Sequence, residues 1–319
     1  MTHNPRRRML IAGALAAASL AGASRADSQG GTLKIGLVLK SLADPFTVAM
    51  IGAARNYQQH YASQFALTIR GTARETDTAA QIQMVGEMIK AKMNAIVIAP
   101  TDSKALTAVV ARAIKAGIIT IAIDNPLDDA AQAAAGIAVP FVGPDNRKGA
   151  TLVGNYLATK LGPRDEVGII EGIPVDRNAK QRTAGSKDAM DAAGVKVVAT
   201  EPGNWDYGKG RDVASKMLGE HPQIRALLCG NDNMAMGAVD AIRDAGRSGA
   251  VYVTGYNAID AIKPLLADGR VLATVNQFAD RQAVFGIDVA LKALTERRKQ
   301  RDLSKVIETP LELVTAGNR

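Results

Sequence analysis

The chain has 319 residues, of which 47% are hydrophobic and 22% charged, a globular composition with room for two domains of about 150 residues. Half of its formal net charge of +8 comes from residues 1–26, because removing their four arginines leaves 35 basic and 31 acidic side chains, a net charge of +4. No long basic run interleaved with aromatic residues occurs, so we expect no nucleic-acid partner.

An export signal is predicted over residues 1–26. Arg6 begins a short basic head, an apolar stretch runs from Met9 to Ala23, and small residues precede Asp27, where we expect cleavage. The apolar stretch is shorter than the ~20 residues of a membrane span. Paired arginines resemble a twin-arginine signal, whereas Pro5 stands where that motif prefers Ser or Thr. We therefore expect a periplasmic protein and leave the Sec and twin-arginine routes open.

Beyond the signal, short β-type runs alternate with amphipathic helical segments. Four such runs are predicted at residues 33–39, 65–71, 95–100 and 118–124, and five more at 166–172, 195–202, 224–230, 251–256 and 271–277. Continuous apolar strands joined by helices predict parallel sheets covered on both faces. The two series predict an α/β fold of two doubly wound parallel-sheet lobes.

Polar or aromatic side chains follow nearly every predicted strand. Ligands of open parallel sheets bind beyond the carboxyl ends of the strands, so we expect a polar cleft between the lobes. Carboxylates, amides and cations can pair with hydroxyl groups, and aromatic faces can cover the C–H surface of a sugar ring. The candidate ligand-binding residues are Lys40, Asp44, Phe46, Asp124, Asn125, Arg182, Trp205, Asn231, Asn257 and Gln277.

Four of these residues have a purely structural alternative. Trp205 would also suit a core position, and Arg182 a surface ion pair. Asp124 could cap the segment that follows it. Asn231 could cap the helix after it, with or without a ligand role.

An enzyme is not expected. No G-x-G-x-x-G follows the first strand and no G-x-S-x-G elbow occurs. His60 and His221 lie in separate helical regions without metal-ligand spacing, and Cys229 is the single cysteine. We therefore expect no cofactor, no metal and no internal disulfide. A sugar-responsive transcription regulator would need an N-terminal helix-turn-helix where the export signal lies.

Nine segments carry a resemblance to a known family. They are "LKSLADPF", "IAPTDS", "IAIDNP", "GPDNRKG", "RNAKQRTAG", "EPGNWD", "CGNDNMAMGA", "VTGYN" and "VLATVNQ". In this order and spacing the chain resembles the periplasmic ribose- and allose-binding proteins of ABC transporters, from about Thr32 to Val314. The resemblance implies hinge closure on a sugar and delivery to a membrane permease.

The resemblance also implies the boundaries of the lobes. The first would comprise residues 32–143 plus 277–308, and the second residues 145–276 plus 310–319. Three hinge segments would cross near Pro144, Asn276 and Pro310. We expect a monomer.

The implied ligand contacts are Phe46, Asp124, Arg182, Trp205, Asn231 and Gln277, with Lys40 matching the allose-type members. Four positions depart from the family's pattern. Asp44 replaces Asn, Thr47 replaces a second aromatic residue, Asn125 replaces the Arg of ribose proteins, and Asn257 replaces Asp. We expect a neutral monosaccharide or polyol, with a smaller or acyclic polyol as a hypothesis. A periplasmic sensor that presents its ligand to a chemoreceptor or membrane kinase is the alternative.

Overall fold

A computed structural model describes residues 32–318, and the predicted export signal lies outside this range. Residues Thr32–Arg319 group into one compact unit. None of the helices between residues 32 and 318 has the length and apolar character needed to cross a membrane.

The first sheet is entirely parallel over its described strands. Its order is β11 (Val306–Glu308), β5 (Phe141–Gly143), β4 (Ile119–Ile123), β3 (Ala95–Ile98), β1 (Leu33–Ser41) and β2 (Phe65–Thr72). Every residue of β3 and β4 is buried, as expected for strands covered on both faces.

The second sheet repeats this plan with one exception. Its order is β12 (Glu312–Thr315), β10 (Ala273–Asn276), β9 (Tyr252–Thr254), β8 (Ile224–Cys229), β6 (Glu166–Glu171) and β7 (Lys196–Pro202). Strand β12 pairs antiparallel with β10. Only residues 309–311 separate β12 from β11, so no crossover helix is available to bring the chain back parallel.

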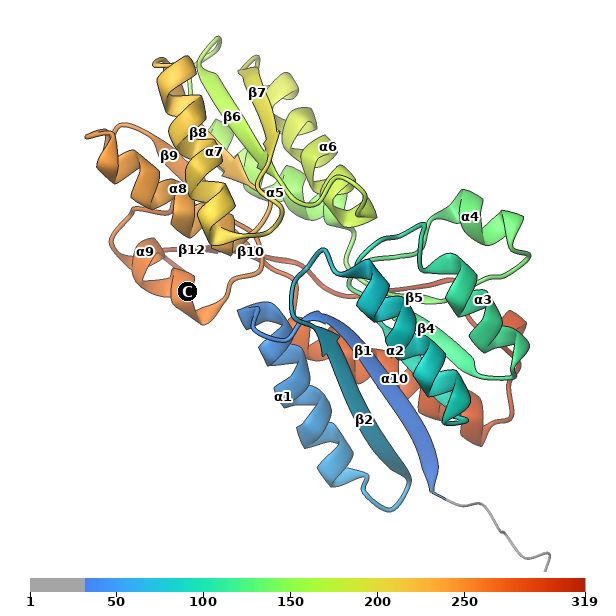
Figure 1. Cartoon of the computed structure of the whole chain (residues 1–319). Coiled ribbons are helices and arrows are strands. Elements are labelled where there is room, and N and C mark those ends of the chain that lie inside the picture. The colour runs from blue at the N-terminus through green and yellow to red at the C-terminus, as the bar shows by residue number, and fades with distance from the viewer. Residues whose placement is uncertain (1–31, 319) are drawn as a thin grey trace, which may run out of the picture. The chain divides into compact units, whose positions relative to one another are not determined.

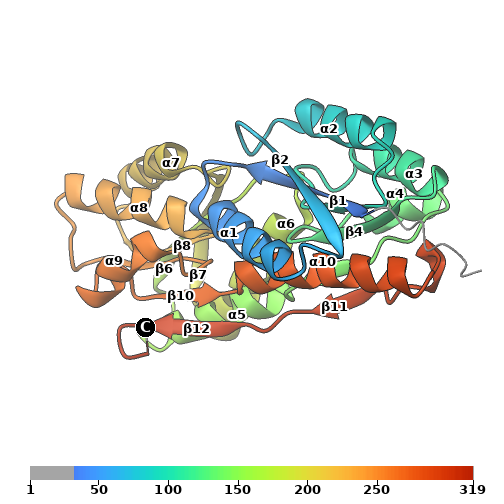
Figure 2. The same cartoon turned by 90° about the horizontal axis from the view of Figure 1, so that it is seen from below.

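Helices cover both faces of each sheet. They are α1 (Pro45–His60), α2 (Thr78–Lys90), α3 (Thr107–Lys115), α4 (Asp129–Ala134), α5 (Asn146–Ala158), α6 (Arg177–Ala192), α7 (Tyr207–Glu220), α8 (Asp232–Asp244), α9 (Lys263–Ala267) and α10 (Ala279–Thr295). Figure 2 shows α2 and α3 on one side of β1 and α1 and α10 on the other. In the second lobe, α5 and α6 pack against one face of the sheet, and α7 and α8 pack against the other face. The predicted two-lobe α/β fold is confirmed.

The chain passes between the two sheets at three places (Figure 1). Strand β5 of the first sheet leads through Pro144 into α5, and β10 of the second leads into α10, which packs on the first. The third passage joins β11 to β12 through Pro310. The carboxyl ends of β1, β3 and β4 therefore lie close to the same three crossings that connect the lobes.

The close packing of α7 against α8 leaves no room for a side chain at Gly237. A Cβ atom there would collide with the backbone of Tyr207 and Arg211 on α7. Gly86 on α2 has open space instead. Gly237→Ala should lower the melting temperature by several degrees, whereas Gly86→Ala should leave it unchanged or raise it, because alanine favours helix by about 0.5 to 1 kcal/mol. Thermal denaturation followed by circular dichroism tests this, and equal effects of the two substitutions would contradict the packing.

Candidate functional site

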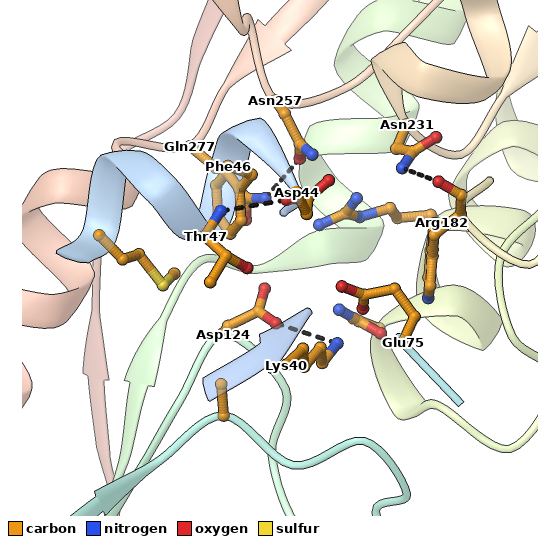
Figure 3. Close-up of a pocket in the computed structure, with 14 residues that line it drawn as sticks. Lys40, Asp44, Phe46, Thr47, Glu75, Asp124, Arg182, Asn231, Asn257 and Gln277 are labelled. Carbon is orange, nitrogen blue, oxygen red and sulfur yellow. Dashed lines mark hydrogen bonds and ion pairs between the residues drawn. The ribbon is translucent and has the colours of Figure 1, made fainter. Parts of the chain in front are cut away.

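A cavity lies at the carboxyl ends of the strands and holds about 430 Å³ of space not filled by atoms, its open mouth included. Figure 3 shows polar side chains from both lobes directed into it. The lining residues are Lys40, Asp44, Phe46, Thr47, Met50, Glu75, Ala99, Asp124, Asn178, Arg182, Trp205, Asn231, Asn257 and Gln277. Nine of the ten residues singled out from the sequence therefore gather in one place.

Asn125 is the candidate that does not line the cavity. It is fully buried, and its amide donates a hydrogen bond to the Pro100 carbonyl at 3.0 Å. Its Oδ1 accepts from Ser103 Oγ at 3.3 Å and from the backbone amide of Asn178 at 3.2 Å. Asn125 thus links the loop after β4 to the start of α6 in the other lobe.

Lys40, at the end of β1, is the cation at the centre of the site. Its Nζ lies 3.0 Å from Asp124 Oδ2 and 3.5 Å from Asp176 Oδ2. Burial opposes the charge of Lys40, but the carboxylates of Asp124, Asp176 and Glu75 outweigh burial and raise the lysine pKa above its ordinary value. The lysine is therefore charged at neutral pH, and it joins β4 to the segment before α6.

Three acids of the site, Asp176, Glu75 and Asp44, have pKa values above those of free carboxyl groups. Burial raises the pKa of Asp176 to about 6, although Lys40 and the Trp205 indole lower it in part. Burial raises the pKa of Glu75 to about 8, with Lys40 opposing and Asp44 and Asp124 reinforcing the shift. Burial likewise raises the pKa of Asp44. The cavity therefore carries less negative charge at neutral pH than its carboxyl groups suggest.

Arg182 is held in place by contacts on three sides. Its Nε donates to Asn146 Oδ1 at 2.8 Å and its Nη1 to the Gly230 carbonyl at 2.9 Å. The guanidinium carbon lies 3.7 Å from the ring centroid of Tyr256, a cation–π contact. Figure 3 shows the guanidinium pointing towards Asp44. The alternative of a surface ion pair is wrong, because Arg182 is only 4% exposed.

Trp205 is both buried and a wall of the cavity. Its Nε1 donates to Asp176 Oδ2 at 2.9 Å, and a Cβ atom at Gly172 would collide with its ring. Asn231 also combines two positions, since its Oδ1 caps α8 by accepting from the Met234 amide at 2.9 Å while the residue lines the cavity. Trp205 and Asn231 therefore each have a structural position and also line the cavity.

Asp44 connects the lobes at the mouth of the cavity. Its Oδ2 accepts from the Thr47 amide at 3.0 Å, which caps α1, and its Oδ1 accepts from Asn233 Nδ2 on α8 at 2.8 Å. The capping alternative raised for Asp124 is not seen, because Asp124 pairs with Lys40.

Backbone strain concentrates near the cavity. Asp124, Trp205 and Asn257 have φ angles of 60°, 66° and 116°, in the left-handed region that side chains other than glycine seldom adopt. Such conformations cost about 1 to 3 kcal/mol each and persist where surrounding contacts impose them, commonly at functional sites.

Sequence reasoning missed several members of the site. Glu75, Asn178, Met50 and Ala99 line the cavity, and Asp176 lies fully buried behind it. Thr47, noted only as a departure, also lines it. Glu75 is the first acidic residue after β2, so applying the strand-end rule to that strand would have found it.

The site has the chemistry of a hydroxyl-binding cavity. Carboxylates accept, Lys40 and Arg182 donate, the amides do both, and Phe46 and Trp205 offer apolar faces. Among residues 32–318, no group of three or more His, Cys, Asp or Glu side chains is placed to hold a metal ion.

Known proteins are similar to this chain over most of its length. The periplasmic binding protein domain model matches residues 35–298. A D-ribose/D-allose-binding protein of Pseudomonas aeruginosa is 56% identical over 283 residues, which are 89% of this chain and 89% of that protein.

Two solved structures are similar over nearly the whole chain. An ABC transporter solute-binding protein from Burkholderia multivorans is 58% identical with a TM-score of 0.87, covers 89% of this chain and 100% of its own, and holds an unknown ligand built as α-D-erythrofuranose. An Actinobacillus succinogenes solute-binding protein with bound D-allose is 30% identical with a TM-score of 0.82, and the match covers 90% of this chain and 98% of that one.

The ion pairs of Lys40 predict a pH-dependent loss of stability. Lys40→Met should lower the free energy of unfolding by about 3 kcal/mol at pH 7.5, because it leaves buried carboxylates without a cation. The loss should shrink towards pH 5, where Asp176, whose pKa is raised to about 6, takes up a proton and no longer needs the cation.

Denaturant unfolding at the two pH values measures this effect. Lys216→Met is the matched control, since Lys216 pairs with Glu201 on the surface and its loss should have little effect at either pH. A loss in Lys40→Met that is equal at both pH values would contradict the charge assignment.

Proposed function

Because the chain belongs to the periplasmic binding protein family, whose members bind solutes and are not enzymes, we propose that it captures a neutral monosaccharide or polyol for an ABC importer. The cavity between the lobes carries this proposal. Its hydrogen-bonding groups come from both lobes, as a site that closes around a polyhydroxylated molecule requires.

The proposed ligand contacts are nine residues that line the cavity. Phe46 and Trp205 cover the C–H surface of the sugar, and Arg182 and Asp124 hold its hydroxyl groups with charged hydrogen bonds. Lys40, Asp44, Asn231, Asn257 and Gln277 complete the set. Asn125 acts indirectly, by joining the lobes through Asn178.

The relatives support a small aldose as the ligand. The Pseudomonas protein is named for D-ribose and D-allose, and the Burkholderia structure holds a ligand built as a four-carbon sugar. Thr47 lines the cavity where the resemblance implies a second aromatic residue in the ribose- and allose-binding members. A smaller side chain there fits either a small aldose or an acyclic polyol.

Binding is proposed to shift the chain from an open to a closed form. We take the lobes as residues 32–143 plus 277–308 and residues 145–276 plus 310–319, with hinges near Pro144, Asn276 and Pro310. The pairs Lys40–Asp176 and Asp44–Asn233 join these lobes. A ligand that contacts both lobes binds the closed form more tightly and so favours it. The closed form is then proposed to dock on the permease.

Other expectations stay predictions. Two similar structures are ABC transporter solute-binding proteins, so we propose transport and not a sensor role. The monomeric state and the export route are untested.

The ligand assignment predicts selective loss of binding in two variants. A thermal-shift screen with pentoses, hexoses, ketoses and polyols should raise the melting temperature by several degrees for at least one sugar, since ligand at 100 times Kd adds about 2.7 kcal/mol. Arg182→Met and Asp124→Asn should each weaken that sugar about 10- to 100-fold, because each removes a charged hydrogen bond.

The controls separate binding from folding. Asparagine suits the left-handed backbone of residue 124, and the melting temperature without ligand checks that each variant folds. Arg243→Met removes an exposed arginine of α8 that pairs with Asp240 and should bind as the unaltered protein does. Unchanged sugar affinity in both folded site variants would overturn the assignment, and a screen without any hit would overturn the sugar class.

A further inference from the structure

Glu75 is a cavity-lining acid whose function the ligand assignment leaves open. It lies in the loop after β2, beside Lys40 and Asp124 in Figure 3. Its Oε1 accepts a hydrogen bond from the Ser41 amide at 3.1 Å. Within residues 32–318, no lysine or arginine lies within ion-pair distance of its carboxyl group. The second oxygen is therefore free to meet a ligand.

Burial favours the neutral form of the Glu75 carboxyl group, and two neighbouring acids reinforce this effect against Lys40. Asp44 at the start of α1 and Asp124 at the end of β4 line the same cavity, while Lys40 is already committed to Asp124 and Asp176. Arg182 on α6 is bound to Asn146 and Gly230. Burial, reinforced by Asp44 and Asp124 and opposed by Lys40, raises the pKa of Glu75 to about 8, so the carboxyl group is mostly protonated at pH 7.

The cavity has a surplus of hydrogen-bond acceptors. Asn178 lines the cavity and its Oδ1 is buried without a partner among the described residues, and Asp124 uses only Oδ2 for Lys40. Each ligand hydroxyl carries a single hydrogen, so acceptors alone cannot satisfy it fully. A neutral carboxylic acid differs from these groups because it can donate.

We propose that Glu75 is a specificity-determining residue whose neutral carboxyl group donates a hydrogen bond to a ligand hydroxyl in the closed form. This inference rests on the proposed function, because it requires a ligand in this cavity. In the open form, water reaches the carboxyl group and favours ionisation. Closure around a ligand therefore takes up a proton at Glu75, and the proton is lost again on release.

The sign of the pH dependence follows from this linkage. A carboxyl group with a higher pKa in the closed form favours closure at low pH, and this advantage disappears as pH rises towards about 8. One proton limits the change in affinity to about tenfold per pH unit. Asp176 contributes around pH 6, so measurements between pH 6.5 and 8.5 isolate Glu75.

Isothermal titration of D-ribose and D-allose into the purified protein tests the proposal. For the sugar that binds, Kd should be several-fold larger at pH 8.5 than at pH 6.5. Titrations at pH 7 in two buffers of different ionisation enthalpy should show uptake of a substantial fraction of one proton. Glu75→Gln keeps a donor and should bind within about threefold at pH 6.5, with a flat pH profile and no proton uptake. Glu75→Ala should bind about tenfold more weakly or worse.

Glu220→Gln, which removes an exposed glutamate at the end of α7, should keep the pH profile of the unaltered protein. Binding by the unaltered protein that is independent of pH, or a Glu75→Gln profile that matches it, would overturn the role of Glu75 and leave the sugar site standing. Failure of both sugars to bind at pH 6.5 would overturn this inference together with the small-aldose ligand on which it rests.

Discussion

The buried ion pairs of Lys40 are the interaction on which the site depends. One ammonium group at the end of β1 faces Asp124 of its own lobe at 3.0 Å and Asp176 of the other at 3.5 Å. Taking a charge out of water costs several kcal/mol unless a partner compensates it. The two lobes can therefore bring their acids together here only around this cation, and the aromatic and amide groups take positions around that pairing.

The remaining groups are fixed before a ligand arrives. Arg182 lies on the Tyr256 ring and is hydrogen-bonded at two nitrogens, and Trp205 is tied to Asp176 through its indole. Side chains held in this way lose little freedom on binding, which lowers the entropic cost. Lys40 is paired with acids of the protein itself, and burial raises the pKa values of Glu75 and Asp44. Such a cavity suits a neutral ligand whose hydroxyl groups both donate and accept.

The sequence predicted much of this arrangement, because continuous apolar strands and polar strand ends follow from the physics of a buried parallel sheet. The prediction failed where the direction of a side chain decides whether that side chain lines the cavity. Asn125 follows Asp124 directly, but the left-handed backbone of Asp124 turns the chain, and Asn125 points into protein instead of the cavity. The strand-end rule points to the loop after β2, but Glu75 stands there among several charged residues, and the folded loop shows that Glu75 lines the cavity. Asp176 looks like an exposed helix start, yet the opposing lobe buries it.

A crystal structure of the protein grown with the tightest sugar from the screen tests the central claim most directly, because it locates the ligand. The account predicts a sugar between Phe46 and Trp205, hydrogen-bonded to Asp124 and Arg182, with the Lys40 pairs to Asp124 and Asp176 intact. A sugar bound at another place, or a complex in which Lys40 has left both carboxylates, would contradict it.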